Sequence, residues 1–409
     1  MKKIVLLGGS TQQIPAILYA KKQGHFTILC DYLIDNPGQH FADRFYCVST
    51  TDHEAVFQIA QNEQIHGIVA YASDPAAPTA AYVAEKLNLP TNPLRSVEIL
   101  SYKDQFREFL KQNGFHSPKA FRCTSLDDAK KLTGELTFPV MVKPIDASGS
   151  KGISKITEHV FLVEAFQQAI THSRSKVVLV EEAIHPDHPY MIAGDCFVID
   201  GKVALWGLLN SHRDVKGNPF VPIGTSYPVV ISDHRMIMVK EQIQRLFDLL
   251  DIRFGAFNIE IMFDQDDRLF FIEVGPRNGG NMIPELLQMI TGVDLVAATV
   301  EAALGHRVEV SPKHDESKMI ATYVLHSKVK GKLEKIDYKD SIKSKIIKSV
   351  MYKKKGDEID IFDASNKAVG IIFAQFESDQ EMTYFMEHAD DFIRIDVDKS
   401  KFFIEIVKS

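Results

Sequence analysis

Residues 138–144 read FPVMVKP, and residues 146–152 continue as DASGSKG. The first segment is a short apolar run typical of a buried strand, and Lys143 stands at its end. The second is a loop whose glycines let backbone N–H groups approach oxygen atoms and whose serines add donors. Together they are suited to binding phosphate, although a basic surface turn has a similar composition. The spacing matches neither the P-loop nor the kinase glycine loop.

A second apolar segment, residues 177–180, runs into Glu181 and Glu182, which Ala183 and Ile184 follow. Such a segment suits the wall of an adenine slot, where a backbone carbonyl and an N–H read the edge of the base. Most strands that end in two glutamates simply lead to solvent. This segment therefore predicts a base site only in combination with others.

Residues 257–274 contain two alternating strand-like runs joined by a polar turn, which predicts a β-hairpin. If the turn centres between Asp266 and Asp267, antiparallel pairing places Glu260 directly opposite Glu273. Two carboxylates that close repel each other unless a cation lies between them. Mg²⁺ binds carboxylate and phosphate oxygens together, so the hairpin predicts a magnesium site. A solvated hairpin face that carries two acids is the alternative.

The hairpin is followed by GPRNGGN, residues 275–281, a glycine-rich turn that carries one arginine and two amides. The guanidinium of Arg277 can bind a transferring phosphate or a substrate carboxylate through two hydrogen bonds. A salt bridge that only holds the turn is the alternative.

The first 95 residues predict a small open parallel sheet. Strands are expected at residues 4–7, 27–31 and 67–70, and helices at residues 14–21 and 75–89. Ligands of such sheets bind at the carboxyl ends of the strands, which here carry Ser10, Asp31 and Asp74. A further helix, carrying Lys103, is expected from Pro93 to Leu110. Residues 311–409 predict a small closing α+β domain.

Composition limits the classes of function. The 409 residues, 45% hydrophobic and 25% charged, predict a globular protein of two to four domains. Acidic residues outnumber basic ones by 54 to 47, and the basic residues are scattered, which argues against a nucleic-acid partner. Four widely separated cysteines favour neither a zinc site nor disulfides, and no stretch has membrane-spanning length. We expect a cytoplasmic protein without a membrane partner.

In this order the segments resemble the ATP-grasp superfamily, and the resemblance covers nearly the whole chain. It implies an α/β and α+β fold with a Rossmann-like domain at 1–95, an ATP-grasp domain at 96–310 with a mobile lid at about 115–185, and the closing domain at 311–409. The resemblance assigns ATP phosphates to Lys103, Lys143 and the loop residues Ser148, Gly149, Ser150 and Gly152. It assigns adenine to Glu181, Glu182, Ala183 and Ile184, the metal to Glu260 and Glu273, and an acyl phosphate to Arg277.

Two positions depart from the pattern of the superfamily. The second metal acid is often followed by Asn and Arg in the pattern Glu-x-Asn-x-Arg, but Gly275 stands at the asparagine position. Asn258, opposite Gly275 in the predicted hairpin, and Asn278 are the candidate replacements. The acid that usually binds ribose is also missing, and His188 stands in that region. Either His188 binds the ribose or the contact is lost.

The resemblance is strongest to carbamoyl-phosphate synthetase halves, biotin carboxylase, purine-pathway ligases and L-amino-acid ligases. It implies an enzyme that uses ATP and Mg²⁺, with Mn²⁺ as a substitute, to join a small carboxylate to an amine through an acyl phosphate. Ser10, Asp74, Arg213 and Arg277 are the candidate substrate contacts. The identity of both substrates and the formation of a homodimer stay open.

Three other functions compete with a carboxylate-amine ligase. The opening strand-turn-helix suggests an NAD(P)-dependent oxidoreductase, but residues 8–13 lack the G-x-G-x-x-G spacing. A carboxylase or carbamoyl-forming enzyme remains an alternative within the superfamily. The glycine at position 275 also raises the alternative of a non-catalytic nucleotide-binding protein.

Overall fold

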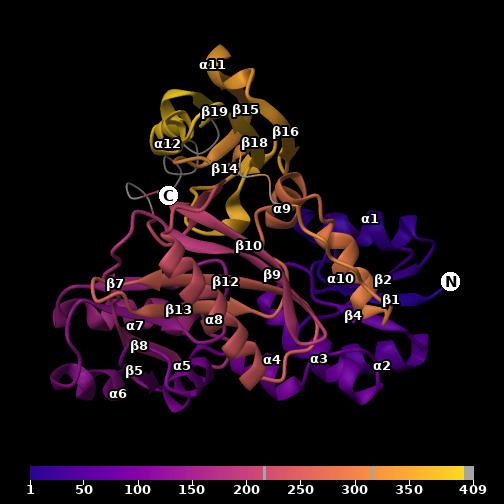
Figure 1. The fold of residues 1–409 in the computed structure, drawn as a ribbon, viewed down its shortest axis with the longest axis horizontal. Coiled ribbons are helices and arrows are strands. Elements are labelled where there is room, and N and C mark those ends of the chain that lie inside the picture. Colours follow the sequence, from indigo (N-terminus) through magenta and orange to yellow (C-terminus); the bar gives the residue numbers. More distant parts are fainter. Residues whose placement is uncertain (215–217, 314, 316, 400–409) are drawn as a thin grey trace, which may run out of the picture. The chain divides into compact units, whose positions relative to one another are not determined.

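The computed structural model describes residues 1–214, 218–313, 315 and 317–399 (Figure 1). The chain divides into two compact units, the first formed by Met1–Leu208 and Ile231–Lys313 and the second by Leu209–Val230 and His314–Ser409. The expected domains 1–95 and 96–310 thus share the first unit, except that residues 209–230 belong with the C-terminal part. The mixture of helices with parallel and antiparallel sheets confirms the expected fold class.

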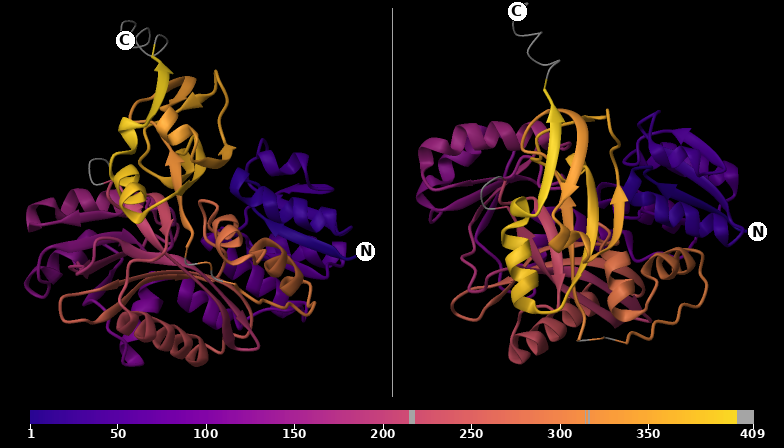
Figure 2. Two further views of the ribbon diagram at one scale, coloured as in Figure 1. Left: turned by 45° about the horizontal axis from the view of Figure 1, so that its top comes forward. Right: turned by 90° about the horizontal axis from the view of Figure 1, so that it is seen from above.

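The N-terminal segment, indigo in Figure 2, forms a parallel sheet. Its strand order is β3-β2-β1-β4. Its strands are β1 (Lys3–Leu7), β2 (Phe26–Asp31), β3 (Arg44–Cys47) and β4 (Gly67–Val69), and its helices are α1 (Ile14–Lys22), α2 (His53–Glu63) and α3 (Ala77–Lys86). Ile4 and Leu6 pack in one apolar cluster and Val5 and Leu7 in another, because successive side chains of a strand point to opposite faces. Both faces of this sheet are therefore buried, and its edge at the strand ends remains for ligands.

The turn after β1 is filled by the protein's own side chains. Gly8 has a φ of 103°, and a Cβ atom there would lie 2.1 Å from Gln13 Nε2. Gln13 Nε2 donates to Leu7 O (3.2 Å) and Tyr71 O (3.1 Å), and Gln13 Oε1 accepts from Ser10 N (2.8 Å). A Cβ atom on Gly9 would meet Asn36 Oδ1 at 2.0 Å. These glycines are explained by the packing of the turn.

An antiparallel sheet in the order β5-β8-β6-β7 follows in the first unit. It consists of β5 (Ala120–Cys123), β6 (Val140–Pro144), β7 (Ser154–Ile156) and β8 (Val178–Glu182), with helices α6 (Leu126–Lys131) and α7 (Leu162–His172). Buried Val140, Val142, Val178 and Val180 pack against Phe166 of α7. Lys143 lies on β6, and the expected phosphate loop lies between β6 and β7.

The prediction of a single helix from Pro93 to Leu110 is wrong. The structure has two helices, α4 (Leu94–Ser101) and α5 (Lys103–Gln112), separated by Tyr102 in an extended conformation. The backbone N–H of Lys103 donates to Ile145 O (3.1 Å), outside the helix. The break therefore places Lys103 in the first turn of α5, beside the loop that follows β6.

The remaining strands of the first unit follow the order β13-β12-β9-β10. They are β9 (Met191–Ile199), the start of β10 (Lys202–Arg213), β12 (Gly255–Phe263) and β13 (Leu269–Gly275), and the helices are α8 (Asp233–Leu249), α9 (Ile283–Thr291) and α10 (Leu295–Ala303). Among the described residues no single helix is long and apolar enough to span a membrane. Helices α9 and α10 pass that test only as a pair, which is bent by 112°.

The second unit contains the end of β10 and strands in the order β10-β11-β14-β18-β16, and a small sheet β17-β15-β19. Its strands are β11 (Pro222–Tyr227), β14 (Met319–Leu325), β15 (Gly331–Tyr338), β16 (Ile346–Met351), β17 (Glu358–Ile359), β18 (Gly370–Phe376) and β19 (Ile393–Asp398), and its helices are α11 (Asp340–Lys343) and α12 (Asp379–Glu387). Buried Met382 and Phe385 of α12 contribute to its core.

Candidate functional site

The expected hairpin of β12 and β13 forms, and at the end away from the turn its residues pair as predicted. Glu260 lies opposite Glu273, and Asn258 lies opposite Gly275. Nearer the turn the pairing shifts by one residue, so that Ile261 faces Phe271 and Ile272 becomes the extra residue of a β-bulge. The turn is centred on Asp266 rather than between Asp266 and Asp267, and the bulge restores the predicted pairing of Glu260 with Glu273. Both acids are partly exposed, whereas Ile259 and Ile261 on the other face are buried.

Lys103 connects α5 to the acidic face of the hairpin. Its Nζ lies 3.4 Å from Glu273 Oε1 and donates to Ala147 O at 3.1 Å. Ala147 belongs to the loop between β6 and β7. The lysine therefore lies between the carboxylate pair and the loop, where the resemblance expects ATP phosphates.

Lys143 and Glu181 form a buried ion pair with Arg107, a residue that sequence reasoning missed. Lys143 Nζ contacts Glu181 Oε1, and Arg107 Nε donates to Glu181 Oε2 at 2.8 Å. Arg107 also donates to Phe271 O and Ile272 O, both at 3.0 Å. Arg107 thus ties β8 to the bulge of the hairpin. In the sequence, only its position on the same helix, four residues after Lys103, could have indicated that Arg107 belongs to the site.

Burial and charge oppose each other in this trio. Burial by itself raises the pKa of Glu181, but the charges of Arg107 and Lys143 outweigh it and lower the pKa to about 2. Burial lowers the pKa of Lys143 to about 8, against the raising effect of Glu181. Lys143 is therefore a cation at neutral pH that loses its proton more easily than an exposed lysine.

The expected adenine segment lies at the end of β8. The side chain of Glu181 lies in the buried trio, so any contact of this residue with a base would come from its backbone. The N–H of Glu182 donates to Lys119 O (3.0 Å) and that of Ala183 donates to Pro139 O (2.9 Å). These contacts leave Ile184 as the next amide along the chain for an adenine ring.

His188 does not offer a ring nitrogen to a ribose in this structure. Its Nε2 accepts from Phe263 N (3.0 Å), and its Nδ1 contacts Tyr190 O. Because Nε2 accepts, Nδ1 carries the proton, and the ring is neutral. Burial lowers the pKa of His188, which keeps it neutral. The geometry favours the second expectation, that the usual ribose contact is lost.

The loop between β6 and β7 is anchored at its start and exposed at its tip. Asp146 accepts from Ser173 Oγ, Arg174 N and Ser175 N at 2.8–3.1 Å. Gly149, Ser150 and Gly152 all have positive φ values, between 63° and 71°. Ser148 lies just before them, so the backbone of this loop has the conformation of a tight glycine turn.

Arg277 forms an ion pair with Asp74 of the short 3₁₀ helix Asp74–Ala76. Arg277 Nη2 lies 2.5 Å from Asp74 Oδ2, and Arg277 Nη1 donates to Asn278 O at 2.9 Å. Asp74 and Arg277 were predicted separately as substrate contacts, and the fold brings them together. The other candidates differ: Ser10 is exposed at the end of β1, and Arg213 belongs to the second unit, where it donates to Phe220 O.

Asn278 was expected to replace the missing metal oxygen, but its geometry does not favour this. Its side chain is fully buried, and its Oδ1 already accepts from Thr299 Oγ1 at 3.0 Å. Asn258 differs, because its Nδ2 donates to Gly194 O and Asp195 Oδ1 while its side chain lies on the same partly exposed face as Glu260. Of the two amides, Asn258 fits the metal site better.

Asp195 on β9 is a second buried acid that sequence reasoning missed. It accepts from Gly279 N (2.8 Å) and from Asn258 Nδ2 (3.0 Å). Burial raises its pKa to about 6 in spite of these hydrogen bonds. Together with Gln12, whose Oε1 accepts from Asn281 N at 2.8 Å, Asp195 holds the glycine-rich turn after β13 in place.

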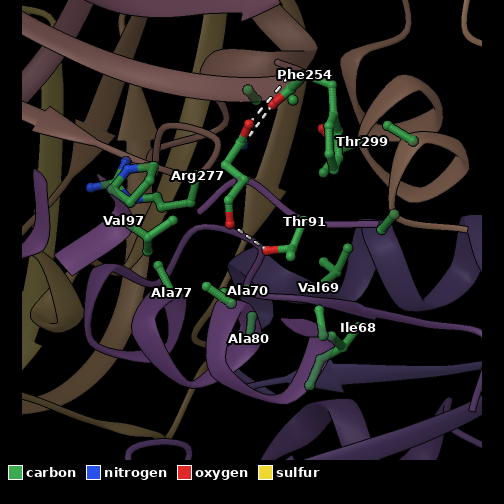
Figure 3. Close-up of a pocket in the computed structure, with 18 of the residues that line it drawn as sticks. Ile68, Val69, Ala70, Ala77, Ala80, Thr91, Val97, Phe254, Arg277 and Thr299 are labelled. Atoms are coloured by element: carbon green, nitrogen blue, oxygen red, sulfur yellow. Dashed lines mark hydrogen bonds between the residues drawn. The ribbon is translucent and has the colours of Figure 1, made fainter. Parts of the chain in front are cut away.

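A cavity of about 100 Å³ adjoins this turn (Figure 3). It is lined mainly by apolar side chains, among them residues of β4, α3 and α10, and Asn278 and Arg277 are among its polar residues. Arg277 lies at one edge in Figure 3, and Val69, Thr91 and Thr299 lie on the other side.

The residues fit a magnesium ion only in company with a phosphate. Glu260 and Glu273 lie opposite each other, and the ammonium of Lys103 contacts one of them. Among the described residues, no group of three or more His, Cys, Asp or Glu side chains is arranged to hold a metal. Mg²⁺ usually keeps one or two carboxylates and takes its other ligands from phosphates and water, which suits this pair.

A lysine on a strand, a second lysine in a helix, a glycine-rich loop and a pair of acids on a hairpin are the features that the resemblance to the ATP-grasp superfamily predicts for a nucleotide site. Residues 136–285 match the model of the ATP-grasp domain. The chain therefore contains an ATP-grasp domain, as the sequence predicted.

The chain is 26% identical, over 281 residues, to the formate-dependent phosphoribosylglycinamide formyltransferase of Sulfolobus acidocaldarius, covering 68% of this chain and 70% of that one. It is 24% identical to the C-terminal section of the carbamoyl phosphate synthase large chain of Aquifex aeolicus, covering 76% of this chain and 60% of that one. The solved L-amino acid ligase of Bacillus licheniformis has the same fold, with a TM-score of 0.81, 21% identity, and coverage of 98% and 99%.

Proposed function

We propose that this protein joins a small carboxylate to an amine at the expense of ATP, through an acyl phosphate, and releases ADP and phosphate. The observation that carries the proposal is the position of Lys103, which contacts Glu273 of the paired acids and the loop before β7. A cation between a carboxylate pair and a glycine-rich loop is arranged to receive a triphosphate. The ATP-grasp domain and the similarity to ATP-grasp ligases support the class of reaction.

The proposed roles follow from charge and position. Lys103 and Lys143 bind the phosphates of ATP, and the N–H groups of residues 148–152 cover them. Glu260, Glu273 and Asn258 would hold Mg²⁺, which neutralises phosphate charge when it is bound. Arg277 holds the carboxylate that attacks the terminal phosphorus atom. Phosphoryl transfer needs mainly such positioning and charge neutralisation, so no side chain has to form a covalent bond.

The net charge of the buried trio supports the proposed role of Lys143 in binding phosphate. Arg107 and Lys143 share one carboxylate, Glu181, so the trio carries a net positive charge inside a buried sheet. A phosphate oxygen that approaches Lys143 offsets this excess charge. We propose that this excess, rather than a single ion pair, attracts the nucleotide.

The amine then attacks the acyl carbon, the bond from that carbon to the phosphate oxygen breaks, and phosphate leaves. An acyl phosphate must be shielded from water, and we propose that the loop at residues 148–152 closes over it. Mn²⁺ is expected to replace Mg²⁺, because it accepts the same oxygen ligands.

A pooled assay tests the proposal. Pure protein is incubated with Mg-ATP and with mixtures of amino acids, sugar acids and purine precursors, and phosphate release is measured. At least one mixture should raise phosphate release above the rate with Mg-ATP alone, and hydroxylamine should trap the acyl phosphate as a hydroxamate. Tight Mg-ATP binding without any substrate-dependent phosphate across the panel would contradict the ligase.

The oxidoreductase alternative loses its support in the first sheet. The turn after β1 is filled by Gln13 and Asn36, and the N–H of Gly9 already donates to Asp31 Oδ2 at 2.7 Å. A pyrophosphate would need these groups unoccupied. No observation on this turn favours a nicotinamide cofactor.

A further inference from the structure

The ion pair of Asp74 and Arg277 uses only part of the hydrogen-bonding capacity of each side chain. Arg277 Nη2 binds Asp74 Oδ2, but Asp74 Oδ1 and Arg277 Nε are both shielded from solvent and have no hydrogen-bond partner among the residues that the structure describes. A buried donor and a buried acceptor left unpaired cost free energy. Two such atoms of opposite kind on one ion pair point to a ligand that has both an acceptor and a donor.

The two unpaired atoms both lie close to Gly275. A Cβ atom built on Gly275 would lie 2.5 Å from Asp74 Oδ1 and 3.1 Å from Arg277 Nε. Asp74 Oδ1 and Arg277 Nε are therefore within about 6 Å of each other. A ligand that carries its cation and its anion on neighbouring atoms can reach both.

The same space explains why Gly275 departs from the pattern of the family. In an asparagine the side-chain oxygen lies about 2.4 Å from its own Cβ atom, as the C–C and C=O bond lengths require. Asp74 Oδ1 stands at almost that distance from the Cβ position of residue 275, so an asparagine there would collide with Asp74. The glycine leaves the space to a carboxylate that comes from the first sheet. An amide oxygen is thereby exchanged for a negative charge next to Arg277.

We propose that Asp74 and Arg277 together bind the α-ammonium and α-carboxylate groups of an amino acid, which is the carboxylate substrate of the ligase. The ammonium group donates to Asp74 Oδ1, and the carboxylate accepts from Arg277 Nε. This inference rests on the proposed function, because Arg277 holds the carboxylate that ATP activates. Recognition of the ammonium group by Asp74 is what it adds.

Binding experiments on the full chain test the site without knowledge of the reaction. Each common amino acid is added to the protein with Mg-ADP, and binding is measured by calorimetry. Each is compared with two analogues, the acid that lacks the amino group and the amide that lacks the carboxylate. At least one amino acid should bind about tenfold or more tightly than both analogues, because it forms both charge-assisted hydrogen bonds.

Three variants separate recognition from folding. Asp74→Asn keeps the size of the side chain and removes its charge, so affinity for the amino acid should fall about tenfold while that for the desamino acid stays the same. Gly275→Ala places a methyl group against both Asp74 Oδ1 and Arg277 Nε and should weaken binding of the amino acid and of the desamino acid alike. Asp248→Asn is the matched control, because Asp248 is an exposed acid paired with Lys202, and it should change neither affinity. Thermal unfolding shows whether each variant is folded.

Three results would overturn the inference. They are no binding of any amino acid by protein that binds Mg-ADP, equal binding of an amino acid and its desamino analogue, and full selectivity in folded Asp74→Asn. If Asp74→Asn alters only thermal stability, the pair is a structural latch and the proposed site is wrong. Failure of the proposed function differs from these results, because an amino acid would still bind through both groups but would release no phosphate from Mg-ATP.

Discussion

Two glycine-containing turns end strands in this protein, and they differ in how their polar atoms are used. In the turn after β1, the interior is filled by Gln13, whose amide bonds to Leu7 O, Tyr71 O and Ser10 N. In the turn after β13, Asp74 Oδ1, Arg277 Nε and Asn278 Nδ2 are buried without a hydrogen-bond partner among the described residues. A glycine-rich turn is thus no evidence of a ligand by itself. The unpaired buried atoms distinguish the two.

The strongest test of this comparison is removal of one acid from the hairpin. Glu273→Gln should lower Mg-dependent phosphate release by a factor of about a hundred or more, because the metal loses a charged ligand and Lys103 loses its partner. Thermal unfolding should change little, because Glu273 is partly exposed. Binding of Mn²⁺ with ADP, followed by electron paramagnetic resonance, should weaken in parallel. Unchanged phosphate release would show that Glu273 does not bind the metal.

The buried trio beside the site predicts a large effect on stability. Arg107→Met removes a cation that holds Glu181 and two carbonyls of the bulge, so the free energy of unfolding should fall by about 3–5 kcal/mol. Denaturant unfolding measures the change. Lys202→Met removes the cation of an exposed ion pair with Asp248 and should cost at most about 1 kcal/mol. Similar losses in both variants would mean that the trio contributes no more than a surface pair.

Alternation and spacing were enough to predict the face of the hairpin that carries Glu260 and Glu273, because a one-residue shift would have turned both acids into the core. The bulge at Ile272 was not readable, since it depends on the carbonyl contacts of Arg107 from a distant helix. The break at Tyr102 was missed for a similar reason. It is stabilised by the bond of Lys103 N to Ile145 O, which no helical pattern encodes.

The ion pair of Asp74 with Arg277 could not be predicted from the sequence either. Both residues were named as candidate substrate contacts, but they are separated by 203 positions, and only the docking of the first sheet on the hairpin brings them together. Gly275 was recognised as a departure from the family pattern without its cause. The cause is the side chain that comes from the other end of the chain to occupy the same space.

Asp195, which holds the turn after β13, should make the stability of the protein depend on pH. The turn after β1 is held by Gln13, which does not titrate. Its pKa is raised to about 6 by burial, above the usual value of 3.8. The folded state therefore binds the proton more tightly than the unfolded state, and stability is lost as the pH rises from about 4 to 6. The loss is at most about 3 kcal/mol for two units of pKa.

A comparison of the wild-type protein with Asp195→Asn isolates this effect from other carboxylates. Denaturant unfolding is measured at several pH values between 4 and 7. The variant should gain stability relative to the wild-type protein as the pH rises, because the amide has no charge to bury. A difference that stays constant with pH would show that Asp195 has an ordinary pKa.

The smallest expected effect comes from the turn after β1, whose interior is filled by the protein's own side chains. Gln13→Ala removes three hydrogen bonds and leaves a small void beside Gly8, so the free energy of unfolding should fall by about 1–3 kcal/mol. Binding of Mg-ADP should remain as in the wild-type protein, because Gln13 fills the turn after β1 and contacts none of the proposed nucleotide-binding residues. Calorimetry with Mg-ADP and denaturant unfolding measure the two effects separately. Weaker nucleotide binding without loss of stability would reverse the roles of the two turns.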